Sequence, residues 1–171
     1  MCAFGQFNIQ SYSFLYQDVA YFDWFKQGNH VRNNELERFR AILIWKRLPK
    51  YAEEGQLNNI WNNFNDNNLE QYPLVTRVFL EHLHQPTKFP IFDDNVWKAM
   101  RTLRPDIAQR TPVNSQDAQY NDYINEYQPF FNELYADNEN DIACPQIDGV
   151  DAEIVKRRFV DRALFEYGRL T

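Results

Sequence analysis

The sequence predicts an all-α protein. Apolar residues recur at helical spacing, as Phe39, Ile42 and Leu43 do, and prolines and asparagine-rich turns separate one periodic segment from the next. Few stretches alternate between apolar and polar residues in the way that a half-buried strand does. The 171 residues suffice for one well-cored domain or for two small helical lobes, and four Trp, ten Tyr and fourteen Phe supply large side chains for a core.

Caps and prolines place the first helices. An aromatic-rich segment, residues 8–25, is expected to pack against the rest of the chain as an arm or a helix. Asn34 is expected to cap a helix that Pro49 ends. A second helix is expected around residues 56–64, before an asparagine-rich loop, and a third near Pro73, because proline suits the first helical turn.

Three further helices are expected in the second half of the chain. A connector with two prolines interrupts the helical pattern, and Asp93 or Asp94 is expected to cap the helix after it. A longer helix is expected over residues 115–135, with a kink at Pro129. The last helix is expected over residues 151–167, where apolar residues again follow a helical period.

Composition narrows the classes of function. The formal net charge of −6 opposes non-specific binding to nucleic acid, although a local basic strip can coexist with an acidic body. Cys2 and Cys144 are too few for a disulfide framework or an iron–sulfur site, and we expect no metal and no cofactor. No run approaches the roughly 20 apolar residues of a membrane span, and the N-terminus lacks the pattern of a secretory signal. The composition therefore favours a cytoplasmic protein that makes no membrane contact.

The stretch from residue 72 to residue 101 carries the candidate chemistry. Asp93 follows the apolar triplet Pro90-Ile91-Phe92 and opens a helix. A carboxylate held at such a junction can act as a general base or stabilise a cationic transition state. The same pattern is also that of a plain N-terminal helix cap, which is common for aspartate.

Two motifs resemble those of a known family. The connector FPIF leads into DDNVWKAM, and the chain ends in DRALFEYG. The first stretch resembles the active-site segment of the helix-hairpin-helix DNA glycosylases, the superfamily of endonuclease III and 8-oxoguanine DNA glycosylase. The end is similar to an Asp-x-x-Leu-aromatic-x-x-Gly pattern of small prokaryotic relatives. The resemblance covers roughly residues 35–168; it places Asp93 on the family's catalytic aspartate and Lys98 on its frequent basic position.

The resemblance also implies an architecture and an activity. One helical domain over residues 1–171 would have a motif-bearing lobe, residues 35–103, and a second lobe made of residues 1–34 and 115–171, around a cleft. The activity implied is that of a base-excision DNA glycosylase, which hydrolyses the N-glycosidic bond of a flipped modified base with Asp93 as its catalytic carboxylate. Trp97 and Tyr72 would stack on the base. Contacts to DNA would come from four residues: Arg77, Asn95, Lys98 and Arg101.

The chain departs from the family pattern at three points. The hairpin glycines are missing, because residues 72–76 read YPLVT. Arg77 stands where bifunctional members carry a lysine, and a guanidinium cannot act as the amine nucleophile of a Schiff base, so no lyase step is expected. Asn95 stands where the motif usually has histidine, and it cannot titrate.

These departures keep other interpretations open. One alternative is a catalytically inactive, glycosylase-like accessory subunit that binds nucleic acid or a protein partner, for example in a phage-defence system. A second is a small helical interaction module that shares only the local motif. The last helix also carries basic residues that are candidates for a phosphate-facing strip or for a solvated face: Lys156, Arg157, Arg158 and Arg162. His82 and His84 are expected at the surface or half-buried, without a shared metal.

Overall fold

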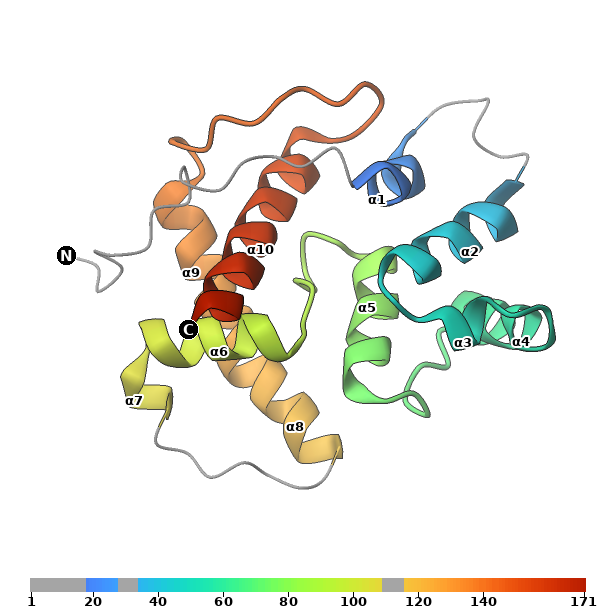
Figure 1. The fold of residues 1–171 in the computed structure, drawn as a ribbon, viewed down its shortest axis with the longest axis horizontal. Coiled ribbons are helices and arrows are strands. Elements are labelled where there is room, and N and C mark those ends of the chain that lie inside the picture. The colour runs from blue at the N-terminus through green and yellow to red at the C-terminus, as the bar shows by residue number, and fades with distance from the viewer. Residues whose placement is uncertain (1–17, 28–33, 109–115) are drawn as a thin grey trace.

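The computed structural model describes residues 18–27, 34–108 and 116–171, and within these residues it is helical, with no β-strand (Figure 1). The prediction of an all-α protein is confirmed. No helix in the described residues has the length and the apolar content that crossing a membrane requires.

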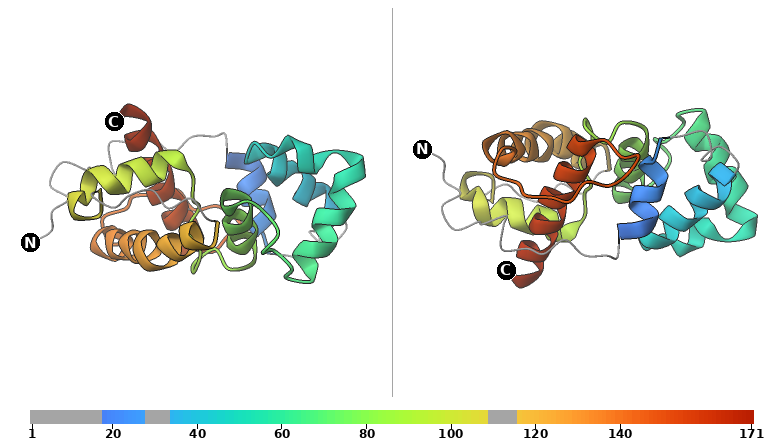
Figure 2. Two further views of the ribbon diagram at one scale, coloured as in Figure 1. Left: turned by 90° about the horizontal axis from the view of Figure 1, so that it is seen from below. Right: turned by 90° about the horizontal axis from the view of Figure 1, so that it is seen from above.

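The helices form two groups that lie side by side (Figure 2). The first group contains α1 (Val19–Phe25), α2 (Glu35–Trp45), α3 (Pro49–Ala52), α4 (Glu54–Asn65) and α5 (Leu74–His84). The second contains α6 (Asp94–Leu103), α7 (Pro105–Ala108), α8 (Gln116–Asp122), a π-helix (Tyr123–Tyr127), α9 (Gln128–Asn138) and α10 (Ala152–Leu170). Each group surrounds its own core of buried apolar and aromatic side chains.

Helix α10 belongs to both cores. Its first turn places Ile154 and Val155 among the buried residues of the first group, whereas Phe159, Val160 and Leu164 are buried in the second. The side chain of Asp151 caps this helix by accepting a hydrogen bond from the Glu153 N–H at 2.8 Å. The helix thus connects the two groups along its length, and the boundary between them runs across it.

The composition of the two groups differs from the predicted lobes. The described helix of residues 1–34, α1, packs mainly against α2, and its N-cap Asp18 and its Tyr21 also contact Arg158 of α10. Helix α6, which the sequence places in the first lobe, packs against α10 in the second. The close α6–α10 crossing requires Gly168, because a Cβ atom there would overlap the backbone carbonyl of Asn95.

Proline positions explain two further differences. Helix α2 ends at Trp45, before the expected stop at Pro49, which instead occupies the first turn of α3. In the later segment Pro129 does not kink a regular helix. A π-helix precedes it, in which the Gln128 N–H bonds to the Tyr123 carbonyl five residues back. The wider turn accommodates the proline, whose ring would collide with a carbonyl in a regular helix.

Candidate functional site

Asp93 caps helix α6 at the boundary between the two groups. Its Oδ1 atom accepts hydrogen bonds from the N–H groups of Asn95 at 2.9 Å and Val96 at 3.1 Å. The expectation that Asp93 or Asp94 caps this helix is therefore confirmed, with Asp93 as the cap. Its side chain keeps 23% of its surface exposed, so the carboxylate is held in place and still reaches solvent.

Three hydrogen bonds hold the backbone of the connector, residues 89–92, that precedes Asp93. The backbone carbonyls of Phe89, Pro90 and Ile91 accept hydrogen bonds at 2.6, 2.8 and 3.2 Å. The donors are, in the same order, the Nδ1–H of His82 and the hydroxyls of Tyr123 and Tyr127 from the π-helix. The irregular π turn therefore serves the site, because it aims two tyrosine hydroxyls at the backbone that precedes Asp93.

His82 is a core residue, which corrects the expectation of a surface or half-buried histidine. Its Nδ1–H donates to a carbonyl, so its Nε2 is the acceptor for the Tyr21 hydroxyl at 3.0 Å. Burial lowers the pKa of His82 to about 3. The imidazole is neutral at physiological pH and acts as a structural link between α1, α5 and the connector.

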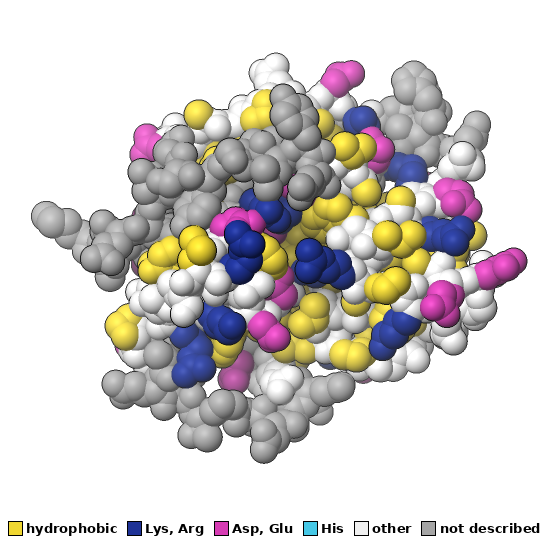
Figure 3. Space-filling view, in the orientation of Figure 1, with side chains coloured by type: hydrophobic (Ala, Val, Ile, Leu, Met, Phe, Trp, Pro, Cys, Tyr) yellow, Lys and Arg dark blue, Asp and Glu magenta, His cyan; other side chains and the backbone are white. Residues whose placement is uncertain are grey.

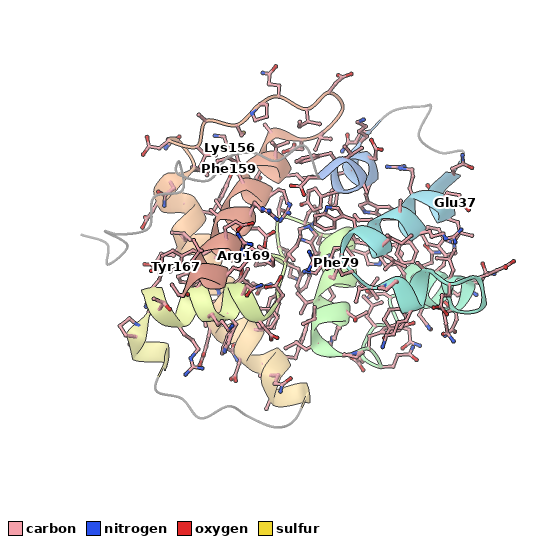
Figure 4. All side chains as sticks on the ribbon, viewed as in Figure 1. Glu37, Phe79, Lys156, Phe159, Tyr167 and Arg169 are labelled. Carbon is pink, nitrogen blue, oxygen red and sulfur yellow. The ribbon has the colours of Figure 1, made fainter. Side chains whose placement is uncertain are left out.

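Lys46, at the C-terminal end of α2, is the nearest cation to Asp93. Its Nζ lies 3.5 Å from Asp93 Oδ2, and its side chain is 10% exposed. The ammonium also lies over the ring of Phe79, 5.9 Å from its centre. Phe79 belongs to α5 and lies on the side of this helix that is nearer to α10 (Figure 4). Burial lowers the pKa of Lys46, and the charge of Asp93 opposes this shift.

A buried ion network continues from this pair into α10. Arg158 donates to both carboxylate oxygens of Asp18 at 3.1 Å, and its Nη1 bonds to Asp161. The indole N–H of Trp45 also donates to Asp18, at 3.3 Å. Burial raises the pKa of Asp161 to about 6, and the charges of Arg158 and Lys46 oppose the shift.

Five charged residues thus form one cluster, which we call the junction cluster: Asp18, Lys46, Asp93, Arg158 and Asp161. They come from the start of α1, the end of α2, the start of α6 and the middle of α10. The cluster has three carboxylates and two cations, so it holds one excess negative charge when all five groups are ionised. Asp161 Oδ1 is buried and has no hydrogen-bond partner among the described residues. Such a site is electrostatically complementary to positive charge that develops beside Asp93.

Sequence reasoning missed four of these five residues. Lys46 offered a signal that was not used, because it follows the same helical period as the buried residues Phe39, Ile42 and Leu43. A lysine on an apolar face requires a buried partner or a route to solvent. Arg158 and Asp161 gave no comparable signal, since arginine and aspartate three residues apart are also common on exposed helices.

Helix α6 carries most of the predicted site residues. Lys98 is exposed, whereas Asn95, Trp97 and Arg101 are half-buried. Trp97 packs edge-on against Phe92, with the ring centres 5.7 Å apart. The helix therefore brings one predicted stacking residue and three predicted DNA contacts onto the element that Asp93 caps.

Two predicted contacts lie elsewhere and already have partners. Arg77 Nε lies 3.2 Å from Glu81 Oε1, and its guanidinium stacks on the ring of Tyr120 at 3.6 Å. Tyr72 is buried in the core of the first group, and its hydroxyl accepts a hydrogen bond from Asn63 Nδ2 at 2.9 Å. Both side chains serve packing and pairing within the fold in this conformation.

The basic residues of α10, for which the sequence left a phosphate-facing strip and a solvated face open, have partners in the described part of the chain. Arg158 is buried in the junction cluster, and Lys156 donates to the Glu139 carbonyl at 2.6 Å. Arg157 and Arg162 pair with glutamates four residues away, at 2.8 and 2.6 Å. Lys156 and Arg169 lie at opposite ends of the helix, as Figure 4 shows. A single phosphate-facing strip is therefore not formed.

The described residues contain no group of three or more His, Cys, Asp or Glu side chains placed to hold a metal ion. The fold and the site thus define an all-α protein with a carboxylate held by a helix start and a buried ion cluster. No family model, curated protein or solved structure matches the chain.

Proposed function

We propose that the chain is a monofunctional DNA glycosylase of the helix-hairpin-helix type that hydrolyses the N-glycosidic bond of a modified nucleotide. The observation that carries the proposal is the setting of Asp93. The carboxylate caps α6, contacts Lys46 and remains partly exposed at the boundary of the two helix groups. This setting agrees with the motif resemblance, in which the aspartate at a helix start is the catalytic residue.

In this proposal Asp93 acts on the sugar of a nucleotide that has left the base stack. As the bond between C1′ and the base nitrogen breaks, its electron pair leaves with the base and positive charge develops on the sugar. The Asp93 carboxylate stabilises that charge, and the excess negative charge of the junction cluster adds to the effect. Water then adds to C1′, and one of its protons balances the charge on the departing base.

The test compares excision by the wild-type chain and by Asp93→Asn on duplexes that carry a panel of modified bases. An asparagine oxygen can still accept the two backbone hydrogen bonds of the cap, so the variant retains the helix start while it loses the charge. We expect excision to fall by about 100-fold or more, the range seen when an electrostatic stabiliser is removed. Wild-type activity that persists in Asp93→Asn would contradict the assigned role.

A second candidate is a non-catalytic accessory subunit that binds nucleic acid or a protein partner. It is favoured by Asn95 in place of the motif histidine and by the pairing of Arg77 with Glu81. Salt-sensitive DNA binding with no excision from any duplex of the panel would favour this candidate over the glycosylase. Excision that depends on Asp93 would exclude it.

A further inference from the structure

The segment around Lys46 is the most basic part of the chain. Residues 40–50, RAILIWKRLPK, contain four basic residues and no acidic one, in a chain with a formal net charge of −6. Lys46 points inward to Asp93, whereas Arg40, Arg47 and Lys50 are exposed. We call these three exposed residues the basic turn.

The cations of the basic turn differ in their pairing from several other basic residues of the described part of the chain. Arg77, Arg104 and Arg162 pair with carboxylates at 3.2, 2.9 and 2.6 Å. Throughout residues 18–27, 34–108 and 116–171, no carboxylate forms an ion pair with Arg40, Arg47 or Lys50. Three exposed like charges on one short segment that itself contains no acidic residue suit an anionic ligand.

The backbone of the turn has the form of a common helix C-terminal cap. Arg47 has φ 64°, in the left-handed region that non-glycine residues seldom adopt. The Arg47 N–H bonds to the Ile44 carbonyl at 3.0 Å, and the Leu48 N–H bonds to the Leu43 carbonyl at 2.9 Å, so the end of α2 holds this conformation. The same arrangement ends α4, where Asn67 has φ 54°, so this cap fixes the backbone that carries Arg47 without indicating a ligand by itself.

Arg47, in the middle of the basic turn, directly follows the residue whose ammonium contacts Asp93. On the other side of Asp93, α6 presents the exposed Lys98. Figure 3 shows Lys and Arg side chains on both sides of the boundary between the two helix groups on this face. Phosphates flank every nucleotide at both its 5′ and 3′ sides, so cations on both sides of a carboxylate that contacts the sugar suit the charges of a DNA strand.

We propose that the basic turn binds DNA phosphates on one side of the nucleotide whose sugar reaches Asp93. The identity of the ligand as DNA rests on the proposed function, whereas the exposed cations of the basic turn are observed independently of it. Ile44, 54% exposed, lies one helical turn after Arg40 and adds an apolar contact for the sugar edge of the strand. In this arrangement the basic turn replaces phosphate contacts that the glycine-free hairpin and the paired Arg77 do not supply.

The experiment measures binding of the full chain to a fluorescein-labelled, undamaged DNA duplex by fluorescence anisotropy over a range of salt concentrations. The test variant is Arg40→Gln/Arg47→Asn/Lys50→Gln, in which asparagine suits the left-handed backbone at position 47. The matched control is Lys26→Gln/Lys88→Gln/Lys156→Gln, which changes the net charge equally at residues outside the turn. Circular dichroism checks that both variants fold.

We expect the test variant to bind at least about tenfold more weakly, and the slope of log K against log salt to fall by about 0.9 for each phosphate that the variant no longer binds. The control should keep a slope close to that of the wild type. An unchanged slope in the test variant, or an equal fall in both variants, would overturn the proposal. So would a wild-type chain that shows no salt-sensitive binding, and tighter binding of an RNA duplex of the same sequence would overturn DNA as the ligand.

Excision assays on the same proteins separate this proposal from the proposed function. If the slope falls as expected and Asp93→Asn leaves excision unchanged, the interface stands and the catalytic role of Asp93 fails. If excision depends on Asp93 and the slope of the test variant is unchanged, the role of the basic turn fails alone.

Discussion

The junction cluster and the basic turn are adjacent and are built in opposite ways. The cluster holds three carboxylates and two cations, of which Asp18, Arg158 and Asp161 are buried, and Arg158 bonds directly to both of these carboxylates. The turn exposes three cations and includes no carboxylate. Buried charges need partners because desolvation is costly, whereas exposed like charges are screened by water and salt. The formal net charge of −6 therefore conceals a local basic surface beside the carboxylate that we propose to be catalytic.

Because of this difference, substitutions in the cluster should change the stability of the fold, whereas substitutions in the turn should change binding. Removal of one charge from the cluster leaves another charge buried without its partner, so the free energy of unfolding should change strongly. Removal of a charge from the turn leaves no buried charge uncompensated, so the effect should appear in salt-dependent binding and hardly in stability. The comparison can be tested by substitutions in each region.

The largest effect is expected from Arg158→Met, which leaves Asp18 and Asp161 buried without their cation. Breaking a buried ion pair costs about 3–5 kcal/mol of unfolding free energy. Urea denaturation followed by circular dichroism measures the change. The control, Arg47→Asn in the basic turn, should change stability by about 0.5 kcal/mol or less. A cost below about 1 kcal/mol for Arg158→Met would show that the cluster does not depend on this pairing.

The next effect is a dependence of stability on pH that comes from Asp161. Burial raises its pKa from 3.8 to about 6, so between these pH values the folded protein binds more protons than the unfolded chain. Stability from this group is therefore present below about pH 4 and is lost as pH rises through about 6. A shift of about two pKa units corresponds to about 3 kcal/mol.

Asp161→Asn isolates this contribution, because asparagine does not titrate. The unfolding free energy of the wild type minus that of the variant should fall by about 3 kcal/mol between pH 4 and pH 7. Urea denaturation at four pH values in this range gives the difference. Other groups titrate in both proteins and cancel, including His82, whose lowered pKa makes the fold less stable as pH falls below about 6.5. A difference that is constant with pH would contradict a raised pKa at Asp161.

Local chemistry allowed much of the fold to be predicted. Asp93 was identified as a cap candidate because capping involves only the next three residues. The expected helix at residues 56–64 corresponds to α4, Glu54–Asn65, since its apolar face is periodic. Pro49 was misplaced because proline can either end a helix or begin one, and only the turn at Arg47 decides between these roles.

The candidate site was less predictable because its contacts span long separations in sequence. Lys46 and Asp93 are 47 residues apart, and Arg158 and Asp18 are 140 residues apart. Helical periodicity identifies which face of a helix is buried, but it does not identify the element that covers this face. The packing of α6 on α10 was not predictable for the same reason, since it depends on where a distant glycine lies.

The smallest effect concerns that glycine. In Gly168→Ala the new Cβ overlaps the Asn95 carbonyl at the start of α6, so the two helices must separate. Overpacking of this kind costs about 1–3 kcal/mol. Gly55→Ala is the matched control, because no atom lies within 4 Å of a Cβ there and alanine favours the helix, so stability should rise by about 0.5 kcal/mol.

The same pair of variants sharpens the comparison between the two regions. A displaced α6 moves Asp93 away from Lys46, so Gly168→Ala should reduce excision by more than its loss of stability explains. The basic turn lies on α2, on α3 and between them, and a Cβ at position 168 would not meet these elements, so the contribution of the turn to the salt slope of DNA binding should remain that of the wild type. The measurements are excision, made well below the unfolding temperature of the variant, and fluorescence anisotropy of DNA binding on the same protein preparations. A variant that loses salt-sensitive binding together with excision would show that the two regions do not act separately.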